Sequence, residues 1–438
     1  FFFRVTQSRQ GVERAIAGVQ RCRVLCNGAE GTYSFHIKLN FPVILIYVWW
    51  ESYIARKPTD FPSSNRQIFR VVLQIMSRDS EQRTVKPLVG AYYYPWYIRN
   101  FHGAKYLRGK HLNPPQLPSM GEYQSTDPKV IAQHVRWSQQ ANIGVWMSSW
   151  WGPDSGSDMV LRNHVLPSSE LGEADLKVAL LYESTNRLGK DTTDLSNVTS
   201  DILHMAEHYF NHPAYLKIDG KPVLELYVSR AIANKGDLAK VVHVMREAAT
   251  SAGFNLFIIG DHAFGPPPLE GSKQYSKKAN EVRLLDGITN YDVYACTKSK
   301  TNPYATQENV DEYIEKQGEW KRLANNVSTA FVPSVSPGFN DRGVRLEVDH
   351  NALARNLSDS SEGSLFRALL KGSIPQVDAG AGNLLLVTSF NEWHEDTQIE
   401  PVDEQPATEQ DSTYTQGIDY PGYGTLYLDI LHEMSSPP

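Results

Sequence analysis

The chain has 438 residues, of which 41% are hydrophobic and 21% are charged, and its formal net charge is −6. This composition is typical of a soluble globular protein and excludes a disordered or polytopic membrane chain. The acidic balance leaves no basic footprint, so we expect no nucleic-acid partner. The three cysteines, Cys22, Cys26 and Cys296, are too few for a disulfide framework or a four-cysteine zinc site. Pairing of Cys22 with Cys26 stays open.

Residues 1–84 carry no motif and little periodicity, so we treat them as an N-terminal extension of unknown function. The 12 residues between Lys38 and Glu51 are all uncharged. A membrane-spanning helix needs ~20 apolar residues, and this run is shorter and rich in aromatic residues. Two interpretations stay open: a buried strand or a degraded signal-anchor.

From residue 85 to residue 438, short apolar or aromatic runs alternate with longer amphipathic stretches. Eight strands alternating with helices over ~350 residues predict an α/β protein with a (β/α)8 barrel of the TIM type, and an open doubly wound sheet is the alternative. The expected strands span residues 88–94, 144–150, 177–182, 222–228, 255–260, 287–291, 330–335 and 383–390.

Helix-like segments separate most of these runs. Asp127 and Pro128 are a suitable N-cap and first residue for one helix, and Val130, His134 and Trp137 recur on one face of it. Further helices are expected at residues 198–210, 238–252, 309–323 and 363–372.

The barrel predicts where the site lies, because active sites of such barrels occupy the C-terminal ends of the strands. Residues that follow the expected strands are rich in Trp, Tyr and carboxylates. Few cations and no phosphate-binding loop accompany them, which favours a neutral polyhydroxylated substrate. Tyr93, Tyr94, Trp151 and Tyr291 are therefore expected to line one pocket. Trp residues at strand ends are equally compatible with core packing.

Several other chemistries are excluded by their missing motifs. No dinucleotide-binding or P-loop glycine pattern follows a strand, and no nucleophile elbow occurs. His394-Glu395 lacks the second histidine of a zinc-protease motif. Asp261-His262 is more typical of a hydrogen-bonded pair than of a metal site. We therefore expect no metal and no cofactor.

The strongest signal is a pair of carboxylates directly after the last strand. Glu392 and Glu395 are three residues apart, and a turn there would bring their side chains within ~5–6 Å. Retaining glycosidases hold their two carboxyl groups ~5–5.5 Å apart. Two such close carboxyls cannot ionise together easily, so one pKa should rise and the acid should stay protonated near neutral pH. A solvated acidic loop is the alternative.

Residues 389–401, Ser-Phe-Asn-Glu-Trp-His-Glu-Asp-Thr-Gln-Ile-Glu-Pro, resemble the signature of glycoside hydrolase family 99, the endo-α-1,2-mannosidases and endo-α-1,2-mannanases. The resemblance covers about residues 86–435 and not the N-terminal part. Other blocks match the family in order, at residues 91–97, 121–128, 143–151, 220–227, 286–291 and 333–341.

The resemblance implies a (β/α)8 barrel and a retaining, metal-free reaction through a 1,2-anhydro sugar. Glu392 would act as the base on the substrate 2-hydroxyl, and Glu395 as the acid that protonates the leaving oxygen. Tyr93, Tyr94, Trp151, Glu183, Tyr291 and Asn391 would bind substrate. One departure concerns the third strand, where many members carry His-Ile-Glu-Pro-Tyr and only Glu183 matches here.

Three functions stay open: an endo-acting α-mannosidase, a barrel hydrolase for another glycan, and a carbohydrate-binding or glycosyltransferase-associated module without turnover. A pure binding module has no need of the Glu392/Glu395 pair, which favours the hydrolases. We expect a monomer with a glycan substrate. Eukaryotic members of the family are Golgi membrane proteins and bacterial members are exported, so the resemblance implies the secretory pathway.

Overall fold

The computed structural model divides the chain into two compact units, residues 1–83 and 84–438, which are described separately. In the first unit, the described part is the backbone of three strands, residues 24–29, 32–40 and 45–52. In the second unit, the described residues are 86–99, 101, 106–189, 193–291, 302–348, 350–407 and 409–436.

The first unit contains an antiparallel sheet in the order β1-β2-β3. Half of the uncharged run, from Leu45 to Trp50, belongs to β3. No helix among the described residues has the length and apolar character needed to cross a membrane. Cys22 and Cys296 lie outside the described residues, as does the Cys26 side chain, so their pairing is not tested. The strands are β1 (Val24–Ala29), β2 (Thr32–Asn40) and β3 (Leu45–Ser52).

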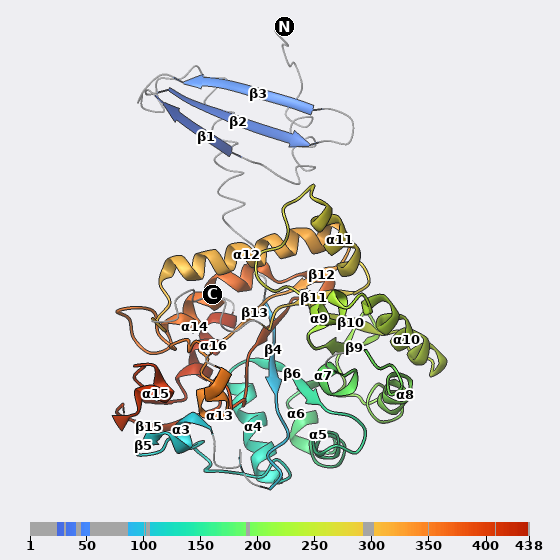
Figure 1. Cartoon of the computed structure of the whole chain (residues 1–438), viewed down its shortest axis with the longest axis vertical. Helices are drawn as coiled ribbons and strands as arrows, with labels where there is room; N and C mark the ends of the chain where they lie inside the picture. The colour runs from blue at the N-terminus through green and yellow to red at the C-terminus, as the bar shows by residue number, and fades with distance from the viewer. Residues whose placement is uncertain are drawn as a thin grey trace. The chain divides into compact units, whose positions relative to one another are not determined.

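The second unit is built around a barrel of parallel strands, which confirms the predicted fold (Figure 1). The strand order is β12-β11-β10-β9-β7-β6-β4-β14-β13. Pro333, which has no N–H to donate, separates β12 from β13, so these two segments are halves of one barrel strand. The Pro333 carbonyl accepts a hydrogen bond from Leu386 N at 2.9 Å, which closes the ring of eight. The strands are β4 (Leu88–Tyr93), β6 (Ile143–Trp150), β7 (Lys177–Tyr182), β9 (Lys221–Leu226), β10 (Phe257–Asp261), β11 (Gly287–Thr289), β12 (Ala330–Val332), β13 (Ser334–Val335) and β14 (Leu384–Val387).

Helices surround this ring on its outside (Figure 1). The predicted start of the first long helix is confirmed, because the Asp127 side chain accepts a hydrogen bond from Lys129 N and Pro128 is the first helical residue. The main helices are α4 (Pro128–Gln140), α8 (Val198–His208), α10 (Leu238–Ser251), α11 (Lys273–Val282), α12 (Gln307–Asn326), α14 (Ser364–Ser373) and α16 (Leu426–Ser435).

Short elements decorate the ends of the barrel. Two small antiparallel pairs lie near the C-terminus: β15 pairs with β17, and β16 pairs with β5 of a much earlier segment. These elements are α3 (Leu107–Lys110), β5 (Leu112–Asn113), α5 (Gly156–Val160), a π-helix (Leu161–Val165), α6 (Ser169–Glu173), α7 (Ser184–Arg187), β8 (Lys217–Ile218), α9 (Ser229–Asn234), α13 (Arg342–Arg345), β15 (Val402–Gln405), β16 (Glu409–Gln410), α15 (Ser412–Thr415) and β17 (Gly422–Gly424), with 3-10 turns at Leu346–Val348, Ile374–Gln376 and Ala379–Ala381.

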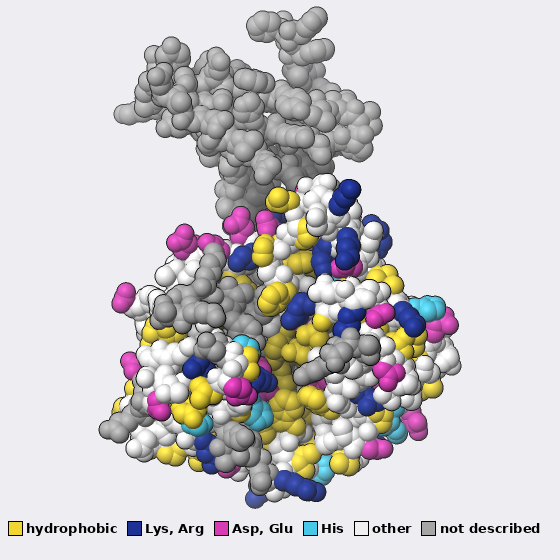
Figure 2. Space-filling model, viewed as in Figure 1, with side chains coloured by type: hydrophobic (Ala, Val, Ile, Leu, Met, Phe, Trp, Pro, Cys, Tyr) yellow, Lys and Arg dark blue, Asp and Glu magenta, His cyan; other side chains and the backbone are white. Residues whose placement is uncertain are grey.

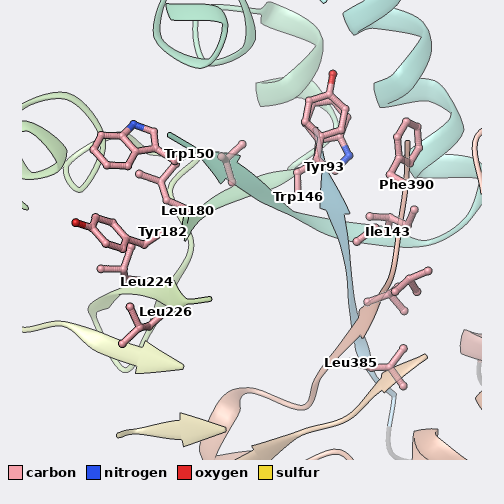
Figure 3. Close-up of a cluster of buried hydrophobic side chains, with 14 of the residues drawn as sticks. Tyr93, Ile143, Trp146, Trp150, Leu180, Tyr182, Leu224, Leu226, Leu385 and Phe390 are labelled. Atoms are coloured by element: carbon pink, nitrogen blue, oxygen red, sulfur yellow. The ribbon is translucent and has the colours of Figure 1, made fainter. Parts of the chain in front are cut away.

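Side chains alternate across the barrel wall, as the two-residue period of a strand requires. Those pointing outward, such as Tyr93, Trp146 and Leu385, pack between strands and helices (Figure 3). Those pointing inward, such as Tyr92 and Met147, fill the barrel. Trp146 and Trp150 of β6 and Trp393 after β14 are at most 1% exposed, so core packing accounts for these three tryptophans.

Candidate active site

The candidate site lies where the C-terminal ends of the parallel strands meet. Tyr94 follows β4 and Tyr291 follows β11, yet their hydroxyl oxygens are 2.5 Å apart. Trp96 and Trp151 pack with ring centroids 6.1 Å apart. Hydrophobic side chains gather in a recess in the middle of the face shown in Figure 2, over the region of the barrel strands. Tyr94 and Tyr291 therefore meet at this end of the barrel, as predicted, and Trp151 packs there against Trp96.

The loop after β14 folds back on itself and carries the two candidate acids. The Ser389 hydroxyl accepts a hydrogen bond from Glu392 N at 2.8 Å, and the Glu392 carbonyl accepts one from Thr397 N at 3.3 Å. Residues 393–396 form the turn that the spacing predicts. Asp396 has a φ of 50°, a left-handed conformation that short polar residues tolerate. The turn places Glu392 and Glu395 at the same end of the barrel.

The other acidic residues of this loop hold it in place. Asp396 is buried and accepts a hydrogen bond from Arg108 Nε at 2.5 Å, and Arg355 Nη2 lies 3.4 Å from the same oxygen. Burial alone would raise the pKa of Asp396, but the charges of Arg108 and Arg355 outweigh it and the pKa is lowered. Asp396 is therefore an ionised anchor adjacent to Glu395.

Glu400 anchors the far end of the same loop. This fully buried carboxylate accepts hydrogen bonds from Trp393 Nε1 at 2.8 Å and from the Tyr123 hydroxyl at 3.0 Å. His134 Nε2 of α4 lies 3.2 Å from its other oxygen. The loop is thus fixed by contacts with α4 at Glu400 and with Arg108 at Asp396. The backbone that carries the two candidate acids is therefore rigid.

Glu392 is only 4% exposed, and His394 holds one of its oxygens. The backbone N–H of His394 donates to Glu392 Oε1 at 2.9 Å, and the imidazole Nδ1 lies 3.1 Å from the same atom. In the part of the chain that the structure describes, Oε2 accepts no hydrogen bond. One oxygen is thus fixed by the protein while the second is free to meet a ligand.

Glu395 has a similar arrangement with a different partner. Its Oε1 accepts a hydrogen bond from Arg345 Nη1 at 2.7 Å, and its carbonyl accepts one from Asn340 N at 2.7 Å. Burial, followed by the charge of Glu392, raises the pKa of Glu395 to about 7, although Arg345 acts in the opposite direction. A carboxyl with this pKa can carry a proton near neutral pH and release it.

Glu183, which follows β7, is a third carboxyl in this electrostatic environment. The Ser149 hydroxyl donates to Glu183 Oε1 at 2.6 Å, and Trp151 Nε1 donates to that hydroxyl at 2.8 Å. Burial raises the pKa of Glu183 to about 8, with contributions from the charges of Glu392 and Glu395. Glu183 is therefore mostly protonated at neutral pH.

Two of the expected site residues need correction. Tyr93 points away from the pocket: its ring stacks on Trp146 at 4.1 Å and its hydroxyl lies 3.1 Å from His134 Nδ1 in the outer core. The reason is the strand alternation, which turns Tyr94 inward and Tyr93 outward. Asn391 is fully buried, and its amide bonds the Tyr94 backbone through both Oδ1 and Nδ2, so it positions Tyr94 rather than meeting a substrate.

Arg345 and Ser149 are site residues that the sequence did not reveal. Arg345 is the last residue of α13 and lies 50 positions before the carboxyl that it contacts. Neither was singled out from the sequence, although Ser149 lies within the family-like block at residues 143–151 and Arg345 follows the block at residues 333–341. Among the described residues, no group of three His, Cys, Asp or Glu side chains could hold a metal ion.

Active sites of (β/α)8 barrels lie at the C-terminal ends of the strands, and glycoside hydrolases use two carboxyl groups there. This barrel carries Glu392, Glu395 and several aromatic side chains at that end. Residues 78–260 match the sequence model of glycosyl hydrolase family 99, and residues 184–408 match that of the glycosyltransferase WbsX family. The WbsX model matches just over half of the chain, which makes the chain a member of that family. The family 99 model and the curated relatives assign the chain to glycosyl hydrolase family 99 as well. Because both matches include residues 184–260, the two families share sequence features there.

Curated relatives agree with the family 99 assignment, and a solved structure shares the fold. The mouse glycoprotein endo-alpha-1,2-mannosidase is 26% identical over 79% of this chain and 73% of its own length. The human glycoprotein endo-alpha-1,2-mannosidase-like protein is 25% identical over 78% of this chain and 73% of its own length. The family 99 endo-alpha-mannosidase of Bacteroides thetaiotaomicron superposes with a TM-score of 0.54 at 21% identity, covering 80% of this chain and 96% of that one.

Proposed function

We propose that the protein is a retaining, endo-acting glycoside hydrolase that cleaves α-1,2-linked mannosidic glycans with Glu392 and Glu395. The observation that carries the proposal is the pairing of two carboxyls on one anchored turn, where burial and mutual charge raise the pKa of Glu395 to about 7. A solvated acidic loop would leave both groups open to water, whereas Glu392 is 4% exposed. Family membership and the mannosidase relatives support the choice of sugar.

In the first step, Glu392 takes the proton of the substrate 2-hydroxyl, and that oxygen attacks C1. The bond from C1 to the leaving oxygen breaks, and Glu395 gives its proton to that oxygen. The products are a shortened glycan and a 1,2-anhydro sugar, with the charge transferred from Glu392 to Glu395. The raised pKa of Glu395 supports its role as the proton donor, since a catalytic acid is most effective with a pKa near the working pH.

In the second step, water attacks C1 of the 1,2-anhydro sugar from the face that the leaving group occupied. Glu395 takes a proton from that water, the bond between C1 and O2 breaks, and Glu392 returns its proton to O2. Both carboxyls then regain their starting states. The configuration at C1 inverts twice, so the α-anomer is retained.

We assign substrate binding to Tyr94, Trp151, Tyr291 and Glu183. The three aromatic residues offer flat apolar surface for a sugar ring, and the protonated Glu183 offers a donor and an acceptor to its hydroxyls. Removal of water by these side chains strengthens the electrostatic interactions of the carboxyl pair. This assignment leaves out Tyr93 and Asn391, whose side chains are buried in contacts with other residues of the protein.

A panel of α-1,2-, α-1,3- and α-1,6-linked manno-oligosaccharides, with α-linked gluco-oligosaccharides beside it, tests the proposal. Internal cleavage of the α-1,2-linked members, unchanged by a chelator, is the expected result. Cleavage restricted to another linkage would change the proposed substrate but leave the proposed roles of Glu392 and Glu395 in place. Absence of cleavage throughout the panel, or loss of activity on chelation with recovery on adding a divalent ion, would contradict it.

The WbsX match favours a second candidate, a glycosyltransferase or transferase-associated carbohydrate-binding module. Such a protein would transfer or bind sugar without hydrolysis. Incubation with nucleotide sugars and manno-oligosaccharide acceptors distinguishes the two: chain extension supports the transferase, and shortening of the oligosaccharide alone supports the hydrolase.

We also propose that the protein is a monomer of the secretory pathway, in the Golgi or outside the cell. Support for the compartment comes from family membership, and the three N-glycosylation sequons, at Asn197, Asn326 and Asn356, add little because a chain of this length carries about two by chance. A tagged full-length chain expressed in eukaryotic cells should shift in mass on treatment with an N-glycosidase. A chain of unchanged mass in the soluble cell fraction would contradict the assignment to the secretory pathway.

A further inference from the structure

Phe264, in the loop after β10, is the only aromatic residue among the described ones that is more than half open to solvent, with 52% of its area exposed. Its backbone is nevertheless held on both sides. Ala263 N donates to the Thr289 carbonyl at 3.0 Å, and Trp320 Nε1 of α12 donates to the Gly265 carbonyl at 2.7 Å. The ring is therefore presented to solvent by a fixed stretch of chain rather than by a loose one.

Arg230 covers one face of this ring. Its Cζ lies 4.7 Å from the Phe264 ring centroid, within the range of a cation–π contact. Its Nη1 donates to Asp261 Oδ2 at 2.5 Å, and Asp261 is 1% exposed. The buried carboxylate thus fixes the guanidinium and neutralises its charge, while 29% of the Arg230 side chain stays exposed.

The same carboxylate connects this pair to the candidate active site. Asp261 Oδ1 accepts a hydrogen bond from Tyr291 N at 3.1 Å, and the Tyr291 hydroxyl meets that of Tyr94. Tyr94 in turn lies within the electrostatic reach of Glu392. Phe264 and Arg230 follow β10 and β9, so they lie at the same end of the barrel as the two carboxyls.

We propose that Phe264 and Arg230 form a remote sugar-binding subsite that takes an uncharged pyranose ring of the glycan, several units from the scissile bond. The exposed ring offers an apolar face for the C–H groups of a pyranose, and the remaining N–H groups of Arg230 can donate to its hydroxyls. The Asp261 partner cancels the cationic charge, which suits a neutral sugar better than a phosphorylated one. This proposal rests on the proposed endo-glycosidase function.

Phe264→Ala in the full-length protein tests the subsite against manno-oligosaccharides of increasing length. We expect kcat/KM on the longest substrate to fall by about three- to tenfold, mainly through KM, with no change on the shortest cleaved one. Phe264→Trp should retain the preference for length. Leu269→Ala, in the same loop and 84% exposed, is the matched control and should leave every substrate unchanged. Equal effects of Phe264→Ala at all lengths, or none at any length, would overturn the subsite.

Binding measurements separate failure of the subsite from failure of the proposed reaction. The Glu392→Gln protein, with and without Phe264→Ala, is titrated calorimetrically with the same oligosaccharides. An affinity for the longer oligosaccharides that depends on Phe264 supports the subsite, even if the wild-type protein cleaves none of them. Absence of cleavage by the wild-type protein would contradict only the proposed hydrolase activity. An affinity that does not depend on Phe264, or no binding at all, would overturn the subsite.

Discussion

Arg345 Nη1 donates a hydrogen bond to Glu395 Oε1 at 2.7 Å, although the two residues are 50 positions apart. The same nitrogen lies 3.1 Å from Asp341 Oδ2, so a buried carboxylate holds the guanidinium against the candidate acid. Arg345 opposes the effects of burial and of Glu392 on the pKa of Glu395. The acid's proton affinity is therefore set by a balance between these groups and the cation.

Replacing Arg345 should move the alkaline limb of the pH–rate profile. Arg345 lowers the pKa of Glu395, and Glu392 and Asp341 raise it, so Arg345→Gln should raise the pKa above about 7. Glu395 would then keep its proton to higher pH. The profile of kcat/KM for Arg345→Gln should extend to higher pH, whereas Arg345→Lys should stay close to the wild-type profile. An alkaline limb that does not move would show that another group controls it.

Glu395→Gln should lose most of its turnover on natural glycosidic linkages, by ~10²–10⁴-fold, because general-acid assistance contributes about this much. A substrate with a good leaving group does not need that proton, so the loss should be smaller there. The comparison uses an oligosaccharide and an activated aryl glycoside of the same sugar. Equal losses on both substrates would remove Glu395 from the role of acid.

Glu392→Gln should be inactive on both kinds of substrate while still binding oligosaccharide. The amide cannot take the proton of the 2-hydroxyl, and neither leaving group relieves that requirement. Calorimetric titration and product analysis provide the two readouts. Unimpaired hydrolysis by this variant would place the catalytic pair elsewhere, with Glu183 as the next candidate.

Glu183→Gln should retain activity within about tenfold of the wild type at pH 6, a smaller loss than acid–base removal produces. Its pKa of about 8 keeps Glu183 protonated at this pH, and a neutral amide can replace a neutral carboxyl in accepting the Ser149 hydrogen bond. Glu183→Ala, which leaves Ser149 and Trp151 without this partner, is the contrasting variant. A loss for Glu183→Gln as large as that for Glu392→Gln would show that Glu183 acts as an ionised group.

Asp396→Asn should reduce the free energy of unfolding by ~3–5 kcal/mol, because it leaves the buried cations of Arg108 and Arg355 without their carboxylate. The pKa of Asp396 is lowered in the folded state, so its stabilising effect is present above the ordinary Asp pKa and is lost as pH falls. Urea unfolding at pH 7 and at pH 3, which is below the ordinary Asp pKa, measures both effects. The difference between wild type and variant should shrink at the lower pH, and a constant difference would contradict the assignment of charge.

The fold was predictable because its signals are periodic and local. Apolar runs spaced by amphipathic stretches identify the eight strands, and Asp127-Pro128 marks a helix start by capping chemistry alone. The placement of Glu392 and Glu395 at one end of the barrel was also predictable, since both follow the last strand and are only three residues apart. Tyr94 and Tyr291 could be placed together because parallel strands of a barrel end on one side.

The errors and omissions concern contacts that depend on register or on distant segments. The choice between Tyr93 and Tyr94 requires knowing which side chain faces the barrel interior. A run of consecutive aromatic residues has no alternation of polar and apolar side chains, so the sequence does not reveal this orientation. Arg345 reaches Glu395 only through the packing of α13, for which the sequence contains no motif. Asn391 has a polar side chain of the type that often binds sugars, yet its amide forms hydrogen bonds with the Tyr94 backbone.

The most direct test of the central claim is time-resolved proton NMR of an α-1,2-linked manno-oligosaccharide during cleavage by the wild-type protein. A retaining reaction with Glu392 and Glu395 as the acting pair predicts that the new reducing end first accumulates as the α-anomer and then mutarotates. It also predicts that neither Glu392→Gln nor Glu395→Gln produces that signal at the wild-type rate. First appearance of the β-anomer, or undiminished cleavage by both variants, would contradict the account.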